Sequence, residues 1–335
     1  MKGDGGVVLR AHGGGGVQTR ELVREVFLSR LGNPALARLD DAAVVAWPGG
    51  RAALTTDSFV VDPWEFPGGN LGDLAVCGTV NDLAMVGAEP RYLTAGFILP
   101  EGFPLAGLAR IAQAMALRAA EAGIQVVAGD TKVVEAGSGP FVNTAGLGVV
   151  PHGRELSGSR AQPGDAVLLT GDVGRHGIAV LSRREGIGFA TEIRSDVAPL
   201  GGLVGRLLAG VSSVRVLRDP TRGGVAEALN EIATQSGAEI EVDEAAVPVG
   251  PGVRSACELL GFDPLHLANE GCALVVLPET DVPAALELLR QHPLGRRAAR
   301  IGSVVGTRPR VVARTLLGGR RLLEPPPGEL LPRIC

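Results

Sequence analysis

The sequence predicts two α+β domains with mixed sheets, followed by a proline-rich C-terminal tail. Its 335 residues suffice for two domains of ordinary size. Candidate strands and helices alternate on both sides of residues 151–165, a stretch rich in Gly, Ser, Arg and Pro. We therefore expect an N-terminal domain over residues 1–150 and a C-terminal domain over residues 163–310.

The composition is typical of a folded protein that does not bind nucleic acid. Apolar residues make up 45% of the chain and charged residues 20%. The net charge is −4, aromatic residues account for 3%, and no basic block occurs. No apolar run approaches the length of a membrane span, and the first residues lack the apolar segment of a signal peptide. Four cysteines without a CxxC pair favour a cytoplasmic protein with free thiols.

Apolar spacing and turn residues predict the elements of the first domain. Apolar residues on one face predict a helix over residues 19–31. A Pro-Gly-Gly turn predicts two strands, over residues 42–47 and 52–61. The elements expected after them are a buried helix over 71–87, a strand over 92–99, an amphipathic helix over 105–122, and strands over 125–128 and 143–150.

The second domain is predicted from the same signals. It begins with a strand over residues 166–170 and a helix near 175–184. Further elements are expected over residues 225–234, 253–260, 272–277 and 282–290. Residues 323–335 differ in kind, because four prolines exclude a helix and a central strand there. We expect this segment to be an extended and loosely held tail.

Isolated carboxylates in apolar surroundings predict a cation site in the first domain. Burying a lone carboxylate is costly unless a cation accompanies it, and hard oxygen ligands select Mg²⁺, which usually arrives with phosphates. The alternative is that each Asp caps a helix or a turn, which we prefer for Asp40. Asp82 lies inside a predicted helix, where capping is not available. The candidate ligands are Asp41, Asp57, Asp82 and Asp130.

Two glycine-rich stretches precede predicted helices and are candidate phosphate cradles. The backbone N–H groups of residues 13–16 can wrap a polyphosphate, although a flexible N-terminal arm explains these glycines equally well. Residues 218–224 read Arg-Asp-Pro-Thr-Arg-Gly-Gly and offer the same chemistry with two arginines. A helix entry with a surface salt bridge is an equal alternative for this second stretch.

Three more residues carry usable chemistry. Lys132 can hold a phosphate or act as a base, and Glu270 can act as a base, but both can also simply pair with other charges. Cys335 bears the terminal carboxylate of the chain, so burying its thiol would bury that charge as well. We therefore expect Cys335 to be an exposed nucleophile or carrier on a mobile arm. The other three cysteines are expected in the core.

These residues lie in motifs that resemble the HypE family of hydrogenase-maturation proteins, within the superfamily of aminoimidazole ribonucleotide synthetase and selenophosphate synthetase. The resemblance covers nearly the whole chain and implies a two-domain PurM-like fold. Its most specific motif is the terminal Pro332-Arg333-Ile334-Cys335, whereas the others indicate the superfamily. Those others are His12-Gly13, Thr56-Asp57-Ser58, Pro67-Gly68-Gly69-Asn70, Cys77-Gly78-Thr79-Val80-Asn81-Asp82, Gly129-Asp130-Thr131-Lys132, Asn143-Thr144-Ala145-Gly146, Asp219-Pro220-Thr221-Arg222-Gly223-Gly224 and Asn269-Glu270-Gly271.

The resemblance implies an ATP-dependent carbamoyl dehydratase that acts on its own C-terminal cysteine. A HypF-like carbamoyltransferase would place a carbamoyl group on Cys335. Phosphorylation of the S-carboxamide oxygen, followed by loss of the nitrogen protons and of phosphate, would leave a thiocyanate. A HypC–HypD-like scaffold complex would then take the cyanide to the iron of a [NiFe] hydrogenase. The resemblance also implies a homodimer and a tail that visits an outer and an inner position.

The same resemblance assigns roles to the candidate residues. Catalysis would fall to Cys335, Lys132 and Glu270. Mg²⁺ would be held by Asp41, Asp57, Asp82 and Asp130. ATP would be bound by Gly13, Gly14, Gly15, Asn81, Asp82, Asp130, Thr131 and Asn143. The chain departs from the family at Gly14, where the family usually has a Ser, so a hydroxyl to phosphate is lost and the amide cradle is kept.

Other activities of the superfamily and a non-enzymatic carrier are the competing hypotheses. Selenophosphate synthetases usually have a reactive Cys or selenocysteine beside the N-terminal glycine-rich loop, and this chain has no Cys before Cys77. Aminoimidazole ribonucleotide synthetase and thiamine-phosphate kinase give no reason for a terminal Cys. A carrier would not need the acidic residues, which this sequence retains together with Lys132.

Overall fold

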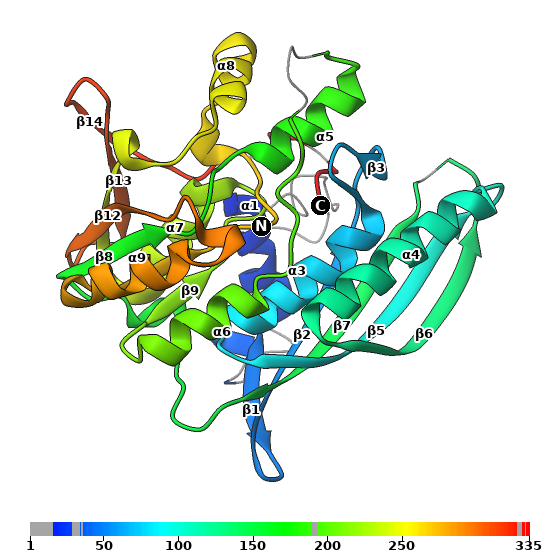
Figure 1. Ribbon diagram of the computed structural model, residues 1–335, viewed down its shortest axis with the longest axis horizontal. Helices are drawn as coiled ribbons and strands as arrows, with labels where there is room; N and C mark the ends of the chain where they lie inside the picture. Colours follow the sequence, from blue (N-terminus) through cyan, green and yellow to red (C-terminus); the bar gives the residue numbers. More distant parts are fainter. Residues whose placement is uncertain are drawn as a thin grey trace.

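The computed structural model describes residues 16–28, 34, 36–137, 139–188, 193–326, 330–331 and 333–335. Two large sheets, each covered by helices, lie next to each other (Figure 1). The strands of the first fall within residues 43–150 and those of the second within 165–322. The predicted pair of α+β domains with mixed sheets is therefore confirmed. Over the described ranges, no helix has the length and apolar character needed to span a membrane.

The first sheet has five strands in the order β1-β2-β7-β5-β6. Their bounds are β1 Ala43–Trp47, β2 Gly50–Phe59, β5 Glu89–Pro100, β6 Gln125–Val134 and β7 Phe141–Val150. The β5–β6 pair is parallel and the other neighbouring pairs are antiparallel, so the sheet is mixed. β6 is an edge strand, and all of its residues are exposed. The sheet therefore ends in an open row of backbone hydrogen-bonding groups.

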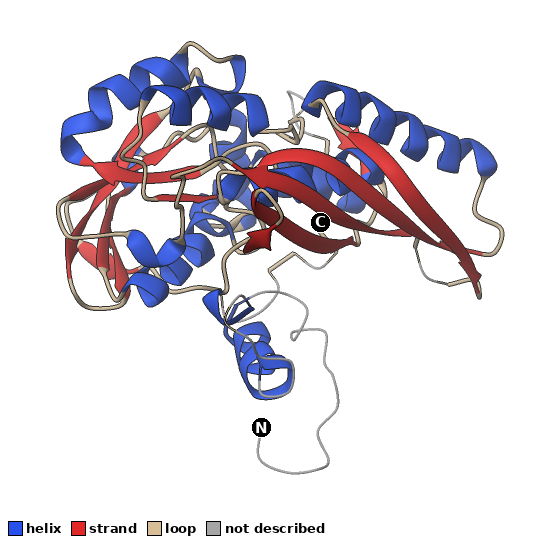
Figure 2. Ribbon diagram, turned by 90° about the horizontal axis from the view of Figure 1, so that it is seen from below, coloured by secondary structure: helices blue, strands red, loops and turns tan. Residues whose placement is uncertain are grey.

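Helices α3 (Leu71–Met85) and α4 (Leu105–Ala122) cover one face of the first sheet (Figure 2). α3 is buried along almost its whole length. Its first residue is fixed by a capping box, in which the Asn70 side chain accepts from the Gly72 N–H and the Asp73 side chain accepts from the Asn70 N–H. α4 has the predicted bounds and ends at Gly123, whose left-handed conformation favours glycine.

Short elements complete the first domain. α1 (Gly16–Leu22) continues as a π-helical stretch over Val23–Leu28, where one longer helix over 19–31 was expected. Residues 29–31 of that prediction lie outside the described part of the chain. β3 (Glu65–Phe66) and β4 (Gly69–Asn70) form a small hairpin before α3. A 3₁₀ turn over Leu36–Arg38 precedes β1.

The second sheet has seven strands in the order β14-β13-β10-β12-β8-β11-β9. The β10–β13 pair is parallel and the other pairs are antiparallel. The strand bounds are β8 Asp165–Leu169, β9 Val216–Arg218, β10 Glu239–Asp243, β11 Leu274–Pro278, β12 Ala299–Gly306, β13 Arg310–Arg314 and β14 Arg320–Leu322. The sheet thus extends beyond residue 310, where the predicted domain ends, because β13 and β14 add to its edge.

Helices pack on both faces of the second sheet. Along β8, Val167 and Leu169 face the core around α7, while Ala166 and Leu168 face the core around α6 and α9. The helices are α5 Arg175–Glu185, α6 Gly201–Gly210, α7 Gly224–Ser236, α8 Pro251–Leu260 and α9 Val282–Arg290. Short 3₁₀ turns occur at Gly158–Arg160, Glu244–Ala246, Pro264–His266, Glu279–Asp281 and Pro293–Gly295. α9 has the predicted bounds, whereas α6, β9, β10 and the last three strands were not predicted.

The C-terminal residues are docked in the protein rather than loosely held. Leu331, Ile334 and Cys335 belong to a hydrophobic core that includes side chains of both domains. Ile334 forms an antiparallel β-bridge with Val61, just after β2. The expected loose tail is therefore wrong for its last three residues in this structure, because they follow the final proline and are free to form backbone hydrogen bonds. Residues 327–329 and 332 lie outside the described part.

Candidate active site

Three carboxylates from separate elements come together where the two domains meet. Asp41 precedes β1, Asp82 lies in the last turn of α3, and Asp219 follows β9. One carboxylate oxygen from each lies within 4.8 Å of the others. Carboxylate oxygens at this spacing are suited to a hard divalent cation such as Mg²⁺. The cluster contains two of the four predicted ligands and adds one that was not chosen.

The electrostatics of this cluster are those of acids crowded together in a buried place. Burial, and then the charges of Asp219, Asp41 and Asp57, raise the pKa of Asp82 well above its usual value. Burial raises the pKa of Asp41 to about 6 and that of Asp219 to about 7, although Arg218 lowers both. Such acids are stabilised in their charged form by a bound cation, which fits the proposed use of the site.

Arg218 does not neutralise the whole cluster. Its Nη2 lies 3.4 Å from Asp41 and 2.6 Å from Glu231, so its charge is divided between two carboxylates. Asp82 instead accepts a hydrogen bond of 2.8 Å from the Thr55 hydroxyl. The residues around the three carboxylates therefore leave negative charge to be balanced.

Asp57 lies on β2 near the cluster, because its charge acts on Asp82. Its carboxylate is not one of the three that lie within 4.8 Å of one another. Burial raises its pKa, which the N–H of Ser58 and the charge of Arg222 lower. Asn143, on the neighbouring strand β7, donates from Nδ2 to the Asp57 carbonyl at 2.8 Å and to the Ser58 hydroxyl at 2.9 Å. A Cβ on Gly78 would lie 2.7 Å from the Phe59 ring and 3.7 Å from Asp57 Oδ2, so this glycine lets α3 approach β2.

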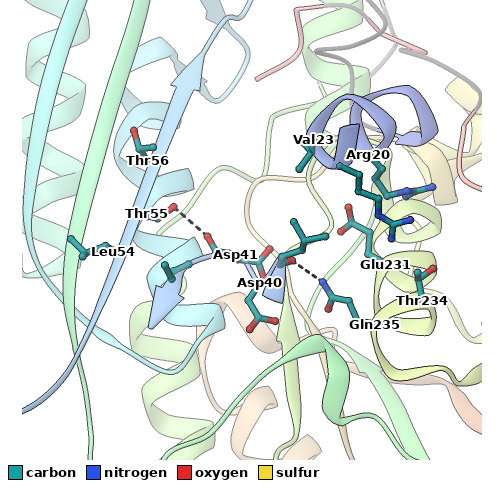
Figure 3. A pocket seen from close by; sticks show the side chains of 14 residues that line it. Arg20, Val23, Asp40, Asp41, Leu54, Thr55, Thr56, Glu231, Thr234 and Gln235 are labelled. Carbon is teal, nitrogen blue, oxygen red and sulfur yellow. Dashed lines mark hydrogen bonds between the residues drawn. The ribbon is translucent and has the colours of Figure 1, made fainter. Parts of the chain in front are cut away.

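A pocket of about 640 Å³ opens beside Asp41 (Figure 3). Asp41 and Thr55 stand on one side of it, and Arg20, Glu231 and Gln235 stand on the other. Its remaining lining residues are Val23, Arg24, Leu39, Asp40, Ala42, Ala43, Leu54, Thr56 and Thr234. The pocket thus joins apolar side chains, charged side chains and Asp41 of the carboxylate cluster, which is a suitable lining for a nucleotide.

The terminal thiol contacts Arg222 and lies within the electrostatic influence of Glu270 and Asp57. Cys335 Sγ is 3.3 Å from Arg222 Nη2, and the Cys335 carbonyl oxygen is 3.4 Å from the same nitrogen. Burial raises the pKa of the Cys335 thiol to about 12, against the lowering effect of Arg222, and the charges of Glu270 and Asp57 raise it further. The expected exposed thiol is therefore wrong for this conformation, because the apolar tail residue Ile334 anchors it inside.

Glu270 is a buried carboxyl with spare hydrogen-bonding capacity. It is 3% exposed, and its Oε1 has no hydrogen-bond partner among the described residues. Burial, and then the charges of Asp219, Asp196 and Asp57, raise its pKa well above the usual value. A carboxyl of this kind is suited to proton transfer.

The loop that bears Glu270 is held from below by Asp196. The Asp196 carboxylate accepts from the Glu270 N–H at 3.2 Å and from the Gly271 N–H at 2.9 Å. A Cβ on Gly271 would lie 1.8 Å from the Asp196 carbonyl oxygen, so only glycine fits there. Asp196 therefore positions Glu270 and was not predicted to do so.

Other predicted residues are not brought to this site by a single chain. Asp130, Thr131 and Lys132 lie on the exposed strand β6, where Lys132 Nζ pairs with Asp130 at 2.8 Å. Asp57 and Asp130 have nearly the same register, but β7 and β5 lie between their strands, which separates them by roughly 14 Å at the usual strand spacing. The prediction that Asp130 and Asp57 of one chain hold the same Mg²⁺ is therefore wrong.

Asn81, predicted to bind ATP, uses its side-chain amide in the contact between the two domains. It is 1% exposed, donates from Nδ2 to the Ala198 carbonyl at 3.1 Å and accepts from the Leu200 N–H at 2.7 Å. These bonds use its amide in holding α3 against the segment before α6. The predicted phosphate-cradle residues Gly13, Gly14 and Gly15 lie outside the described residues.

Asp219 and Arg222 were singled out only as part of a glycine-rich stretch. The positive φ angles of Gly223 and Gly224, 79° and 65°, form the turn between them and α7. A Cβ on Gly224 would lie 2.6 Å from the Leu265 carbonyl oxygen, so this turn packs closely on its neighbour. Gly223 and Gly224 indicated in the sequence that a tight turn precedes this helix. They did not indicate which side chains of the turn face the site.

Comparison with known proteins assigns the family. Residues 39–150 match the model of the AIR synthase related protein N-terminal domain, and residues 162–314 match that of its C-terminal domain. A carbamoyl dehydratase HypE from Cupriavidus necator is 53% identical over 328 residues, which cover 97% of this chain and 93% of that protein. The chain belongs to the HypE family of carbamoyl dehydratases.

Solved structures of HypE proteins share the fold over more than nine tenths of the chain. A HypE–HypF complex contains a chain of 48% identity and TM-score 0.87, covering 91% of this chain and 99% of that one. A HypE solved in complex with ATP has 48% identity and TM-score 0.83, covering 98% of this chain and all of that one. The PurM-like fold expected from the resemblance is confirmed.

Proposed function

We propose that this chain uses ATP to dehydrate an S-carboxamide carried on Cys335 to a thiocyanate, which supplies the cyanide ligand for [NiFe] hydrogenase maturation. The observation that carries the proposal is the position of Cys335 Sγ, 3.3 Å from Arg222 and within the electrostatic influence of Glu270 and Asp57. Asp57 thereby links the thiol to the carboxylate cluster, because its charge acts on both Cys335 and Asp82.

The acidic residues would hold Mg²⁺, whose charge would assist transfer of the terminal phosphoryl group. Asp41, Asp82 and Asp219 present their oxygens to one point, and Asp57 lies beside them. The raised pKa values of these acids support a site whose charge is completed by a cation. The pocket beside Asp41 would receive the nucleotide, since Asp41 both lines the pocket and belongs to the carboxylate cluster.

Dehydration of the Cys335 adduct would remove one oxygen and two hydrogens from the carboxamide. The carboxamide oxygen takes the terminal phosphoryl group of ATP, which makes that oxygen a good leaving group. The nitrogen gives up two protons, the C–O bond breaks to release phosphate, and the electrons of the N–H bonds complete the C≡N bond. Glu270 would take a proton, a role supported by its buried Oε1, which has no hydrogen-bond partner among the described residues. Arg222 is placed to hold the sulfur and the adjacent group.

A homodimer would complete the site. β6 offers an open edge with exposed apolar side chains, among them Val127 and Val133, and a second copy would cover it. That copy would bring Asp130 and Lys132 of the partner subunit toward the cluster, which a single chain does not do. The predicted roles of Asp130 and Lys132 then belong to the dimer.

The tail must also reach other proteins. A HypF-like carbamoyltransferase would load Cys335, and a HypC–HypD-like complex would remove the cyanide. The thiol is buried in this structure. Loading and unloading of Cys335 therefore require residues 333–335 to break their hydrogen bonds and undock. All four cysteines are free thiols, and the reaction needs Cys335 reduced, so we place the enzyme in the cytoplasm.

Intact-mass spectrometry tests the reaction. The protein is incubated with a HypF-like carbamoyltransferase and its substrates, and then with or without ATP. We expect a carboxamide adduct on Cys335 that loses one water when ATP is present and persists when ATP is absent. A stable adduct in the presence of ATP and Mg²⁺ would contradict the proposal.

A matched variant locates the chemistry. Cys335→Ala is expected to keep the fold and ATP binding, because it removes one atom from a tail that follows both domains, and to form no adduct. Cys257→Ala is the control, since that cysteine is also buried but lies on α8. Adduct formation on Cys335→Ala would place the reaction elsewhere.

A further inference from the structure

The last three residues dock through backbone hydrogen bonds that leave one carbonyl facing the other way. The Val60 N–H donates to the Cys335 carbonyl and the Asp62 N–H donates to the Arg333 carbonyl, both at 3.1 Å. In an extended segment, successive carbonyls point to opposite sides. The Ile334 carbonyl therefore points away from residues 60–62 and needs a donor from another element, because Ile334 is 2% exposed.

That donor is His176, in the first turn of α5. His176 is 0% exposed, and its Nε2 lies 2.7 Å from the Ile334 carbonyl oxygen. Since a carbonyl can only accept, Nε2 carries the hydrogen and Nδ1 is the acceptor. Nδ1 lies 2.9 Å from the Ser195 hydroxyl, which in turn accepts from the Val197 N–H at 3.1 Å. These hydrogen bonds fix the His176 tautomer that carries its hydrogen on Nε2, and this N–H faces the tail.

The surroundings keep this imidazole neutral and still. Burial lowers the pKa of His176 to about 4. The Phe66 ring packs edge-on against it, with 5.2 Å between ring centroids. A neutral imidazole with one fixed N–H is suited to donate a hydrogen bond to the Ile334 carbonyl, and it is not suited to pair with a charged group.

The segment that orients His176 also orients Glu270. Ser195 supports the His176 ring, and the adjacent Asp196 accepts from the backbone N–H groups of Glu270 and Gly271. The Ser195 N–H is anchored to the Pro67 carbonyl at 2.8 Å. One short segment thus fixes the tail that carries the sulfur and the loop that carries the candidate base, which sets their relative position.

We propose that His176 is a positioning residue for the reaction: acting through the Ile334 carbonyl and oriented by Ser195, it holds the tail so that Cys335 Sγ contacts Arg222 in the neighbourhood of Glu270. This role rests on the proposed function, because it supplies the alignment that dehydration of a Cys335 adduct needs. The alternative is a histidine that merely fills the core against Phe66, and the two roles differ in what they do to Cys335.

Two variants separate the roles. His176→Gln keeps an N–H donor at the end of a side chain of similar reach, whereas His176→Leu keeps volume and removes the donor. The first measurement is the rate at which iodoacetamide alkylates Cys335 in the ATP-free protein, read by peptide mass spectrometry. We expect a rate roughly tenfold higher in His176→Leu, the effect of losing one buried hydrogen bond, and a rate near that of the unmodified protein in His176→Gln. Cys77, Cys257 and Cys272 report the fold, since all three are buried.

Unchanged alkylation of Cys335 in His176→Leu, with the other three cysteines protected, would overturn the proposal. If His176→Leu exposes all four cysteines, Ser195→Ala decides, because it removes the orienting hydroxyl and leaves the ring in place. We expect Ser195→Ala to raise the alkylation of Cys335 severalfold and that of no other cysteine. No increase in that variant would also overturn the proposal.

A single-turnover assay on the carbamoylated protein distinguishes this proposal from the function on which it rests. We expect His176→Leu to lower the rate of water loss at saturating ATP, to leave the ATP concentration for half-maximal rate unchanged, and to be rescued by His176→Gln. If the unmodified protein forms no thiocyanate while His176→Leu still releases the tail, the proposed function fails and the tail contact stands. Normal dehydration in His176→Leu would overturn the positioning role alone.

Discussion

Arg222 Nη2 lies 3.3 Å from the sulfur of Cys335. The same nitrogen lies 3.4 Å from the Cys335 carbonyl oxygen. The guanidinium thus contacts both the backbone end and the reactive atom of the docked tail. Its charge is also what opposes the rise in the pKa of the thiol.

Arg222→Met is expected to slow the dehydration of a carbamoylated Cys335 by roughly 10- to 100-fold, because a charge-assisted hydrogen bond to the reacting group is lost. Arg222→Lys should lose less, since the charge remains while the planar donor set is lost. Single-turnover mass spectrometry measures both rates. Arg254→Met is the control, because Arg254 lies on α8 and makes no contact with Cys335. Equal rates for the two Met variants would contradict a role for Arg222.

Glu270→Gln is expected to reduce the dehydration rate by about 10²- to 10⁴-fold, the usual contribution of a general base. Binding of ATP and docking of the tail should persist, because the Asp196 contact to this loop uses the backbone N–H groups. Glu279→Gln is a matched control at an exposed ion pair with Arg300. A Glu270→Gln variant that dehydrates at the normal rate would remove Glu270 from proton transfer.

The carboxylate cluster predicts a pH-dependent stability that Mg²⁺ should cancel. An acid whose pKa is raised by folding binds its proton more tightly in the folded state, so stability falls as the pH rises from its unfolded value toward its folded value. For Asp219 this window runs from 3.8 to about 7. Without Mg²⁺, Asp219→Asn should therefore raise the free energy of unfolding at pH 7.5 by on the order of 2 kcal/mol relative to the unmodified protein, with little change at pH 4.

Thermal unfolding at the two pH values, with and without Mg²⁺, measures this effect. The gain from Asp219→Asn should disappear when Mg²⁺ is added, because the ion stabilises the unmodified cluster and not the weakened one. Asp165→Asn provides a control, since Asp165 is also buried but pairs with Arg215 far along the second sheet. A stability gain that is independent of pH and of Mg²⁺ would contradict the cluster as a cation site.

Local sequence identified two acids of the cluster from the apolar residues near them and did not identify the third. Asp82 was predicted because it is the only charge in its helix segment, and Asp41 because it starts an apolar strand beside Asp40. Asp219 lies between arginines at 218 and 222, which resembles a surface ion pair until the fold turns Arg218 toward Asp41 and Glu231. The direction in which a side chain leaves a turn depends on tertiary packing, which spacing along the chain does not contain.

The helices with regular apolar spacing were predicted well, as was β8, whereas most other strands of the second sheet were not. α4 and α9 have the expected bounds because an amphipathic face and a clear end signal fix them locally. β9, β13 and β14 are short, so each shows too few alternations to be recognised. The place of Cys335 was beyond reach for a related reason, since it depends on a bridge between Ile334 and Val61, far apart in sequence.

The edge strand β6 gives the last prediction, on assembly. Val133 is 67% exposed in the described chain, and Asp130 and Lys132 lie on the same strand. Val133→Glu should convert a dimer into a monomer, because it places a charge where a second copy would bury an apolar side chain. Light scattering after gel filtration measures the mass, and the mass-spectrometric assay measures dehydration.

We expect the monomeric variant to lose dehydration while Cys335 still becomes carbamoylated, since in the proposed dimer loading would use the tail and the reaction would use groups of both subunits. Leu317→Glu is the control, because Leu317 is 98% exposed at the turn between β13 and β14 and lies on the other domain. That variant should remain dimeric and active. A monomeric Val133→Glu with full activity would show that one chain suffices, and Asp130 and Lys132 would then have no part in the reaction.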